Sequence, residues 1–451
     1  MSKDIKIKNG LTIKLKGAAR NIVKNAAFPK SISINPSDFH LITPKMKLKV
    51  GEKVSQGDVV FFSKKDDRIK FCSPIDGIIT DVVRGAKRKI IEIIIDVNKN
   101  QILKDSKSIF LDDLGTEKIK GILLESGCWP FIKQRPYDII ANPSDIPKSI
   151  FISGFNSAPI SADLDIILDD QREEFETGIN VLNKLTSGSI NVSINKNSSN
   201  FINTIKGIKT HKINGPHPSG NVGVQIHHID PVNSGDRVWT LGAEDVAIIG
   251  RYFMTGIYNP IRTIAVSGPP VKYPQYYKTI PGTELKKIIQ DAGINTNDSL
   301  RIINGDVLTG SKVDHDNYLG FYNNTLSVLR EGNHYRMFGW IPFVNNKVPS
   351  IYKTSFSWLF PNKKYDLDTN LNGEERAFVV TGEMEKVFPM DIFPMQLLKE
   401  CMAGNIEKME SLGIYEVAPE DFSLIDYSSS SKIEAQYIIR QGLDLMISEV
   451  G

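Results

Sequence analysis

Between about residues 119 and 256, segments with the apolar spacing of a β-strand alternate with segments that have the apolar spacing of an α-helix. The stretch 169–188 has apolar residues three or four positions apart, which predicts an amphipathic helix with one buried face. That face carries Phe175, Ile179, Leu182 and Leu185. The same patterns predict strands at 149–159, 189–194 and 262–268 and a second helix at 243–256. A strand-helix-strand order predicts a mostly parallel, Rossmann-like sheet with helices on both faces.

Residues 50–95 have a different texture, with short β-rich runs separated by glycine and proline turns. The pattern GxxVxxGD, followed by a charged hairpin and SPxxGxI, resembles the flattened β-barrel of biotinyl and lipoyl carrier domains. In those carriers a lysine at the hairpin tip holds the prosthetic group. The tip here is "KKDD" at 64–67, without the residues that surround the carrier lysine, so we expect a solvated charged turn.

Two further units follow the α/β segment. Residues 281–313 combine a short helix that ends at Gly293 with a strand and a glycine-rich turn, which suggests a small ubiquitin-like β-grasp unit. Residues 393–413 and 431–450 have apolar residues at helical spacing, so the chain is expected to finish in helices.

Composition narrows the class of protein. The chain of 451 residues is 41% hydrophobic and 24% charged with a net charge of +3, which gives no reason to expect a nucleic-acid partner. Its three cysteines form no CxxC pair, and the first residues contain no apolar signal segment, so we expect a reduced, cytoplasmic protein. The longest apolar runs are far shorter than the roughly 18 residues that a spanning helix needs.

A histidine-rich loop, "THKINGPHPSGNVGVQIHHIDPV" at 210–232, is the most conspicuous candidate for a metal site. It contains His211, His217, His227 and His228. Zinc requires about four ligands in close pairs, whereas these spacings are loose. In a strand, the adjacent His227 and His228 would point to opposite faces. We therefore predict no metal ligand here and expect the histidines to bind backbone or solvent; a zinc-binding module is the alternative.

Several strings along the chain carry a family resemblance. The histidine-rich loop contains GPHPxG, followed by an expected short strand and PVN. The other strings are "ESGCWPFIKQRPYD" (125–138), "VLTG" (307–310), "YLGFYNNTLSVLREG" (318–332), "FGW" (338–340) and "PMDIFPMQLL" (389–398). In this order they resemble the A subunits of bacterial Na+-translocating NADH:quinone oxidoreductases (Na+-NQR). The resemblance covers essentially the whole chain.

The resemblance, with the patterns above, implies an α/β multi-domain protein. The expected parts are a biotinyl/lipoyl-like barrel at 1–100, a Rossmann-like α/β domain at 101–257, a β-grasp (SLBB-like) domain at 258–330, an irregular connection at 331–376 and a C-terminal helical domain without Fe–S cysteines at 377–451.

The A subunits of this family are similar in turn to the C subunit of the Rnf complex and to the FMN- and NADH-binding subunit of respiratory complex I. Those relatives bind flavin phosphate with a run such as GxGGAGFPT, because glycine lets backbone amides approach a phosphate. This chain has Trp129, Pro130, Phe131 and Ile132 at that place. Bulky side chains and a proline without an N–H should block such a cradle. No GxGxxG or Walker A sequence occurs elsewhere.

The iron–sulfur motifs of the relatives are absent too. A cluster needs four thiolates, and the matching stretches 382–398 and 414–433 contain no cysteine, while Cys401 is expected to pack on a helix. We therefore expect no cofactor-binding, metal-binding or catalytic residue in this chain. By resemblance, FMN, FAD, riboflavin and Fe–S centres lie on partner subunits.

Two contact hypotheses remain. Trp129 and Phe131 could stack on a flat quinone ring while Arg135 donates to a carbonyl oxygen; the alternative is that these aromatics fill the space of a flavin. Contacts with membrane subunits are expected at the aromatic and basic stretches 273–278 and 343–360.

The resemblance implies a peripheral subunit on the cytoplasmic face of the bacterial inner membrane. It would dock on the membrane-embedded B subunit, together with the other members of a six-subunit complex, which passes electrons from NADH to ubiquinone and exports Na+. The competing expectation is an independent flavin-dependent NADH dehydrogenase of the same fold.

Overall fold

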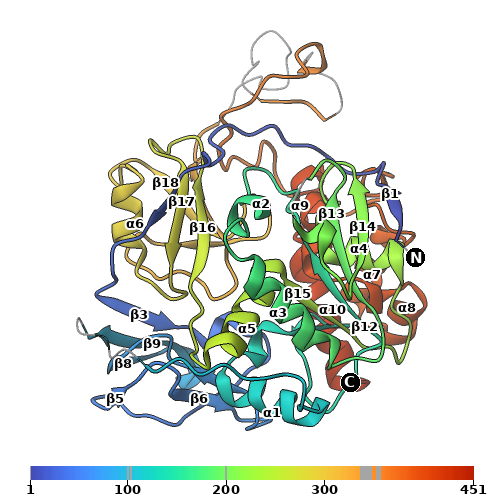
Figure 1. Ribbon diagram of the computed structural model, residues 1–451. Coiled ribbons are helices and arrows are strands. Elements are labelled where there is room, and N and C mark those ends of the chain that lie inside the picture. Colours follow the sequence, from blue (N-terminus) through green and yellow to red (C-terminus); the bar gives the residue numbers. More distant parts are fainter. Residues whose placement is uncertain (1, 99–100, 102–103, 199–200, 336–347, 352–356) are drawn as a thin grey trace.

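The computed structural model describes residues 2–98, 101, 104–198, 201–335, 348–351 and 357–451. Figure 1 shows a barrel at the bottom, a large α/β sheet on the right, a smaller sheet on the left and the C-terminal helices in red. Within the described ranges, no helix is both long and apolar enough to cross a membrane.

The barrel consists of two antiparallel sheets, one with the order β3-β9-β8-β5 and one with the order β4-β6-β7. Along β9, Ile93 and Ile95 are fully buried and their neighbours point outward, so the strand presents one face to the core. This confirms the short strands predicted for residues 50–95; their pairing is antiparallel. The strands are β3 (Ser31–Ile34), β4 (Pro44–Met46), β5 (Lys53–Val54), β6 (Val59–Ser63), β7 (Lys70–Cys72), β8 (Gly77–Arg84) and β9 (Ile90–Val97).

The α/β sheet has the order β1-β14-β13-β12-β15-β10-β11. Its strands are parallel from β1 to β15, and β10 and β11 are antiparallel at one edge. The bounds are β1 (Asp4–Lys6), β10 (Lys133–Arg135), β11 (Ile139–Ile140), β12 (Ser149–Ser153), β13 (Ile190–Asn195), β14 (Lys209–Asn214) and β15 (Val238–Gly242). The predicted mostly parallel sheet is therefore confirmed.

Alternation along the central strand β12 explains why helices cover both faces. Ile150 and Ile152 join the core formed with α3 and α5, whereas Phe151 packs on the other face with Ile226 of α4. All four residues of the apolar face predicted for 169–188 are buried, although Leu185 lies just beyond the end of α3. The helices are α1 (Thr116–Ser126), α2 (Leu164–Ile167), α3 (Arg172–Asn183), α4 (Val222–Ile229) and α5 (Ala243–Thr255).

Helices α3 and α5 approach closely because glycine stands at their crossing. A side-chain carbon at Gly250 would lie 1.7 Å from the carbonyl oxygen of Glu174, and one at Gly178 would lie 2.1 Å from that of Val246. Neither position has room for a methyl group, so the crossing depends on both glycines.

The smaller sheet has the order β19-β18-β20-β16-β17-β2 and is covered by α6 (Leu285–Asp291), which confirms the helix that was predicted to end at Gly293. Its strands are β2 (Val23–Asn25), β16 (Arg262–Ser267), β17 (Gln275–Thr279), β18 (Leu300–Asn304), β19 (Ser311–Val313) and β20 (Thr325–Arg330). The first strands of the chain do not join the barrel, although they lie in the range 1–100: β1 pairs with β14 and β2 with β17.

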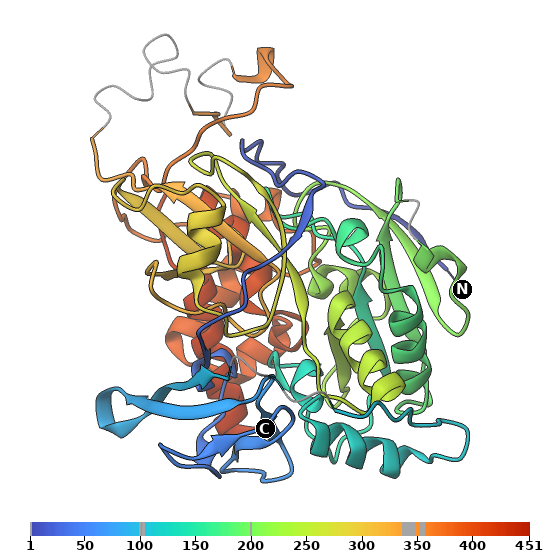
Figure 2. The same cartoon turned by 60° about the vertical axis from the view of Figure 1, so that its left-hand side comes forward.

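The C-terminal helices are α7 (Pro394–Ala403), α8 (Ile406–Ser411), α9 (Ser423–Ser428) and α10 (Ala435–Glu449). The predicted helix over 393–413 is two helices, because Gly404 adopts a left-handed φ of 67° and ends α7. Their core includes Ile7, Ile213 of β14 and Val224 of α4, so the helices pack directly against the α/β domain (Figure 2).

Candidate functional site

A polar cavity of about 530 Å³ lies at the carboxyl edge of the parallel strands. The strands β13 and β14, which follow β12 in the chain, lie on one side of β12, and β15 lies on its other side. The strand order therefore reverses between β12 and β15. Ligands of open α/β sheets bind at this kind of reversal. The ends of both strands line the cavity, as do the start of α4, the turn between β18 and β19, and the segment before β20.

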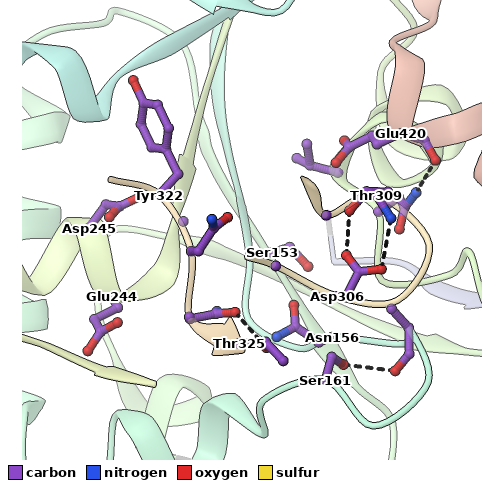
Figure 3. A pocket seen from close by; sticks show the side chains of 18 of the residues that line it. Ser153, Asn156, Ser161, Glu244, Asp245, Asp306, Thr309, Tyr322, Thr325 and Glu420 are labelled. Atoms are coloured by element: carbon purple, nitrogen blue, oxygen red, sulfur yellow. Dashed lines mark hydrogen bonds between the residues drawn. The ribbon is translucent and has the colours of Figure 1, made fainter. Parts of the chain in front are cut away.

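Carboxylates occupy the N-terminus of α5, which faces the cavity. The backbone N–H of Thr263 donates to Glu244 at 2.6 Å, and the guanidinium of Arg262 donates to Asp245 at 2.9 Å. Burial raises the pKa of Glu244 to about 7, although Arg262 acts in the opposite direction. Figure 3 shows Glu244 and Asp245 on one side of the cavity and Asp306, Thr309 and Glu420 on the other.

Carboxylates also stand at the N-terminus of α4. A side-chain carbon at Gly223 would lie 2.4 Å from a carboxylate oxygen of the fully buried Asp421. The side chain of Asn221 donates to the backbone carbonyl of Glu420 at 3.1 Å. Both helix N-termini at the cavity are therefore covered by acidic residues of the chain itself, and an incoming phosphate would meet negative charge there.

The residues that were compared with a flavin-phosphate loop from the sequence form a short 3-10 helix, η3 (Trp129–Phe131). Trp129 is fully buried, donates its indole N–H to the carbonyl of Ala141 at 2.8 Å and meets Trp239 edge-on. It does not line the cavity, whereas Phe131 does and stacks on Phe321 with the ring centres 4.8 Å apart.

Arg135 lines the same cavity and is buried among acids. Its guanidinium donates to Glu420 at 2.7 Å and lies 3.7 Å from Asp421 and 3.8 Å from Asp138. Burial opposes the charge of Arg135, but the surrounding carboxylates raise its pKa. Nε and Nη1 have no hydrogen-bond partner within the described part of the chain.

The groups that the fold family implies do not fit this chain. A flavin phosphate would have to replace the packed Trp129–Phe131 helix and approach carboxylates at both helix N-termini. A cluster would need four thiolates, but the sequence has three cysteines, and burial raises the pKa of each thiol to about 12. We derive no redox step in this chain through either group.

The four histidines of the histidine-rich loop contact different residues of the chain. His211 contacts Asn191, and His217 contacts Ser157. The expected strand for His227 and His228 is wrong: both lie in the last turn of α4, because apolar residues of this segment pack as a helix on Phe151. His227 contacts Glu416 at 2.7 Å, and the ring of His228 bonds to the carbonyl of Pro389. Among the described residues, no group of His, Cys, Asp and Glu has the arrangement of a metal site.

The two stretches that were expected to contact membrane subunits differ in how far their aromatic side chains are exposed. Within 273–278, Tyr276 and Tyr277 are buried in β17, because both faces of this strand are covered: Tyr276 joins the core shared with the α/β domain, and Tyr277 joins the core beneath α6. The expected exposed aromatic patch is therefore wrong there apart from Tyr273. Of the stretch 343–360, residues 343–347 and 352–356 lie outside the described residues, and the remainder includes the exposed Trp358.

The acidic residues of the cavity were not singled out from the sequence. The available signal was the pair Glu244–Asp245 directly after a strand, at the first turn of a helix. Such a pair is typical of helix capping, and only the structure shows that it faces Arg262 and the cavity.

Comparisons with known proteins cover the same units. Family models match residues 5–98 (NqrA N-terminal barrel-sandwich hybrid domain), 114–258 (NqrA second alpha/beta domain) and 263–315 (NQRA C-terminal domain, SLBB). These matches confirm the α/β multi-domain class with its barrel-sandwich, α/β and SLBB parts. A solved NAD+-reducing [NiFe]-hydrogenase chain in the air-oxidized state aligns at 11% identity over 77% of this chain and 67% of that chain, with a TM-score of 0.37, which is too low to establish a common fold.

Full-length relatives are more informative. Proteins named as the A subunit of Na(+)-translocating NADH-quinone reductase are similar to this chain in Marinomonas sp. (33% identity, 98% of this chain and 99% of the relative) and in Photorhabdus laumondii (33%, 97% and 98%). The relative of that name in Neisseria gonorrhoeae is 32% identical over 99% of this chain and 100% of its own length. The chain therefore belongs to the A-subunit family (NqrA) of the Na(+)-translocating NADH-quinone reductases.

Proposed function

We propose that this chain serves as the A subunit of a complex that couples NADH oxidation and ubiquinone reduction to Na+ export. Similarity over nearly the whole length to relatives of that name carries the proposal. The chain would lie on the cytoplasmic face of the bacterial inner membrane and contact the B subunit in an assembly of six. FMN, FAD, riboflavin and Fe–S centres would reside on its partners. The finer fold assignments, a biotinyl/lipoyl-like barrel and a Rossmann-like domain, belong to the same proposal.

Capture of the tagged full-length chain from detergent-solubilised membranes tests this role. We expect the other subunits to co-purify and the preparation to reduce ubiquinone with NADH in a Na+-stimulated reaction. Recovery of the chain alone, together with unchanged membrane activity after deletion of its gene, would contradict the proposal.

We also propose that the cavity accepts a quinone ring. Phe131 offers a stacked aromatic wall with Phe321, and Arg135 has guanidinium N–H groups without a hydrogen-bond partner in the described structure. A buried donor without a partner is unfavourable, and a quinone carbonyl would satisfy it. Trp129 would act behind the cavity, since its hydrogen bond to Ala141 holds the η3 segment in place.

Titration of the full chain with a ubiquinone of one isoprene unit tests the second proposal. Phe131→Leu removes the aromatic wall and should weaken binding about three- to tenfold. The matched control is Phe253→Leu, which changes another buried core phenylalanine that does not line the cavity. Unchanged affinity in a folded Phe131→Leu protein, or equal weakening in both variants, would exclude the cavity as the quinone site.

A further inference from the structure

The segment around η5 (Ser357–Leu359) exposes three consecutive large apolar side chains. Trp358 and Leu359 are each 54% exposed, and Phe360 is 62% exposed. Figures 1 and 2 show this orange segment standing clear of the body of the molecule. A contiguous apolar projection is unfavourable in water and marks a surface that a partner covers. We call Trp358, Leu359 and Phe360 the aromatic tip.

Four lysines lie at the base of the aromatic tip, next to residues 361–365. Lys363 and Lys364 follow Phe360 after two intervening residues and are exposed. The N-terminal segment adds Lys14 and Lys16, because its backbone pairs with Tyr365 through hydrogen bonds of 2.8 and 2.9 Å. The ammonium group of Lys14 also donates to the backbone carbonyl of Pro361. Two segments far apart in the sequence thus bring four lysines to one apolar projection.

Acidic residues are missing from the sequence around the tip. No Asp or Glu occurs between Gly332 and Tyr365, and the next carboxylate, Asp366, is paired with Arg330 at 2.8 Å. The cores of protein interfaces are rich in aromatic residues but poor in lysine, which counts against the subunit contact that the sequence suggested for this end of 343–360. Exposed Trp, Leu and Phe beside lysines, without acids, are instead typical of segments that enter the headgroup region of anionic membranes.

We propose that the aromatic tip docks directly on an anionic lipid surface. Trp358, Leu359 and Phe360 enter the headgroup region, and the four lysines contact anionic headgroups. This contact adds a lipid anchor to whatever partner subunits hold the chain, and it is independent of the cavity and of quinone binding.

Flotation of the purified full chain with vesicles tests the docking surface. Vesicles of phosphatidylglycerol and phosphatidylethanolamine should bind the chain, and phosphatidylcholine vesicles should bind it far more weakly. The double variant Trp358→Ser with Phe360→Ser should lose about tenfold or more in affinity for the anionic vesicles. The matched control is Phe110→Ser, which removes an aromatic side chain that is 80% exposed elsewhere on the molecule.

Charge-neutralising variants distinguish a specific role of the lysines at the tip from a general effect of the protein's net charge. Lys363→Gln with Lys364→Gln should weaken binding about fivefold per lysine, equivalent to about 1 kcal/mol each, and reduce its salt dependence. Lys64→Gln with Lys65→Gln, at the barrel hairpin, removes the same charge and should bind nearly as the parent does. The proposal is overturned if the parent ignores anionic vesicles, if the controls lose as much affinity as the tip variants, or if tip variants bind vesicles normally but fail to enter the complex. The last result would assign the tip to a protein partner.

Discussion

Arg135 and Glu420 meet across the junction between the α/β sheet and the C-terminal helices, with guanidinium Nη2 2.7 Å from carboxylate Oε1. The contact joins the strand β10, which follows η3, to the segment 419–422 between α8 and α9. Asp421, which has no exposed side-chain surface, stands 3.7 Å from the same guanidinium. Arg135 is therefore the cation that compensates buried acids at this junction.

Replacing Arg135 with methionine should destabilise the chain by about 3–5 kcal/mol, because the buried Asp421 would lose its compensating cation. Urea unfolding of the full chain measures the change. The control is Arg172→Ala, which removes an exposed pair with Glu176 one helical turn away and should cost less than about 0.5 kcal/mol. An Arg135→Met protein as stable as the parent would show that the junction does not depend on this charge.

The crossing of α3 and α5 predicts a strong response to a single methyl group. Gly250→Ala places a carbon against the carbonyl of Glu174, so the helices must move apart, and we expect a loss of about 1–3 kcal/mol or more. Gly121→Ala, in α1, brings the new carbon within 4 Å of no atom of the described residues and should be neutral or stabilise by up to about 1 kcal/mol. Thermal unfolding of both variants compares them; equal melting temperatures would contradict the close crossing.

We expect the folded protein to lose stability in mild acid because of the buried His217. Burial lowers its pKa from 6.5 to about 4, although Asp306 acts in the opposite direction. The unfolded chain binds a proton below about pH 6.5 and the folded chain only below about pH 4, so stability is full above pH 6.5 and falls between these values. The contribution lost is about 3 kcal/mol at most.

Urea unfolding of the parent and of His217→Gln at pH 7.5 and pH 4.5 measures this contribution. The variant should lose less stability than the parent between the two pH values. His315→Gln, at an exposed histidine, should retain the slope of the parent. Parallel pH profiles for the parent and His217→Gln would exclude His217 as the source.

Local periodicity was sufficient to predict the helices α3, α5 and α10 and the strands β12, β13 and β16. The apolar face of α3 could be identified because burial repeats with the helical period within one segment. His227 and His228 could not be placed in the same way, since α4 follows a proline- and glycine-rich loop and is fixed by packing against Phe151. The break at Gly404 was also hidden inside an apolar pattern that continues across it.

The cavity could not be predicted because its lining comes from segments far apart in the chain. Glu244 starts a helix and Glu420 lies near the C-terminus, so each looks like an ordinary exposed or capping acid in the sequence. The sequence did place Phe131 and Arg135 near one site, and both line the cavity. It did not show that Trp129, two residues before Phe131, points into the core.

The packed η3 segment and the absence of a four-cysteine set from the sequence predict that the full chain, purified without partners, shows no flavin or iron–sulfur absorption in the visible region. Trp129 and Phe131 leave no backbone cradle for a phosphate, and carboxylates cover the helix N-termini at the cavity. Incubation with FMN, followed by gel filtration, should return a colourless protein. Glu244→Gln removes one acidic group while leaving the loop intact, and we expect it to remain colourless as well. Stoichiometric flavin bound to the parent would show that neither the missing backbone cradle nor the acidic residues exclude the cofactor. Flavin bound only to Glu244→Gln would show that charge, rather than the missing glycines, excludes the cofactor.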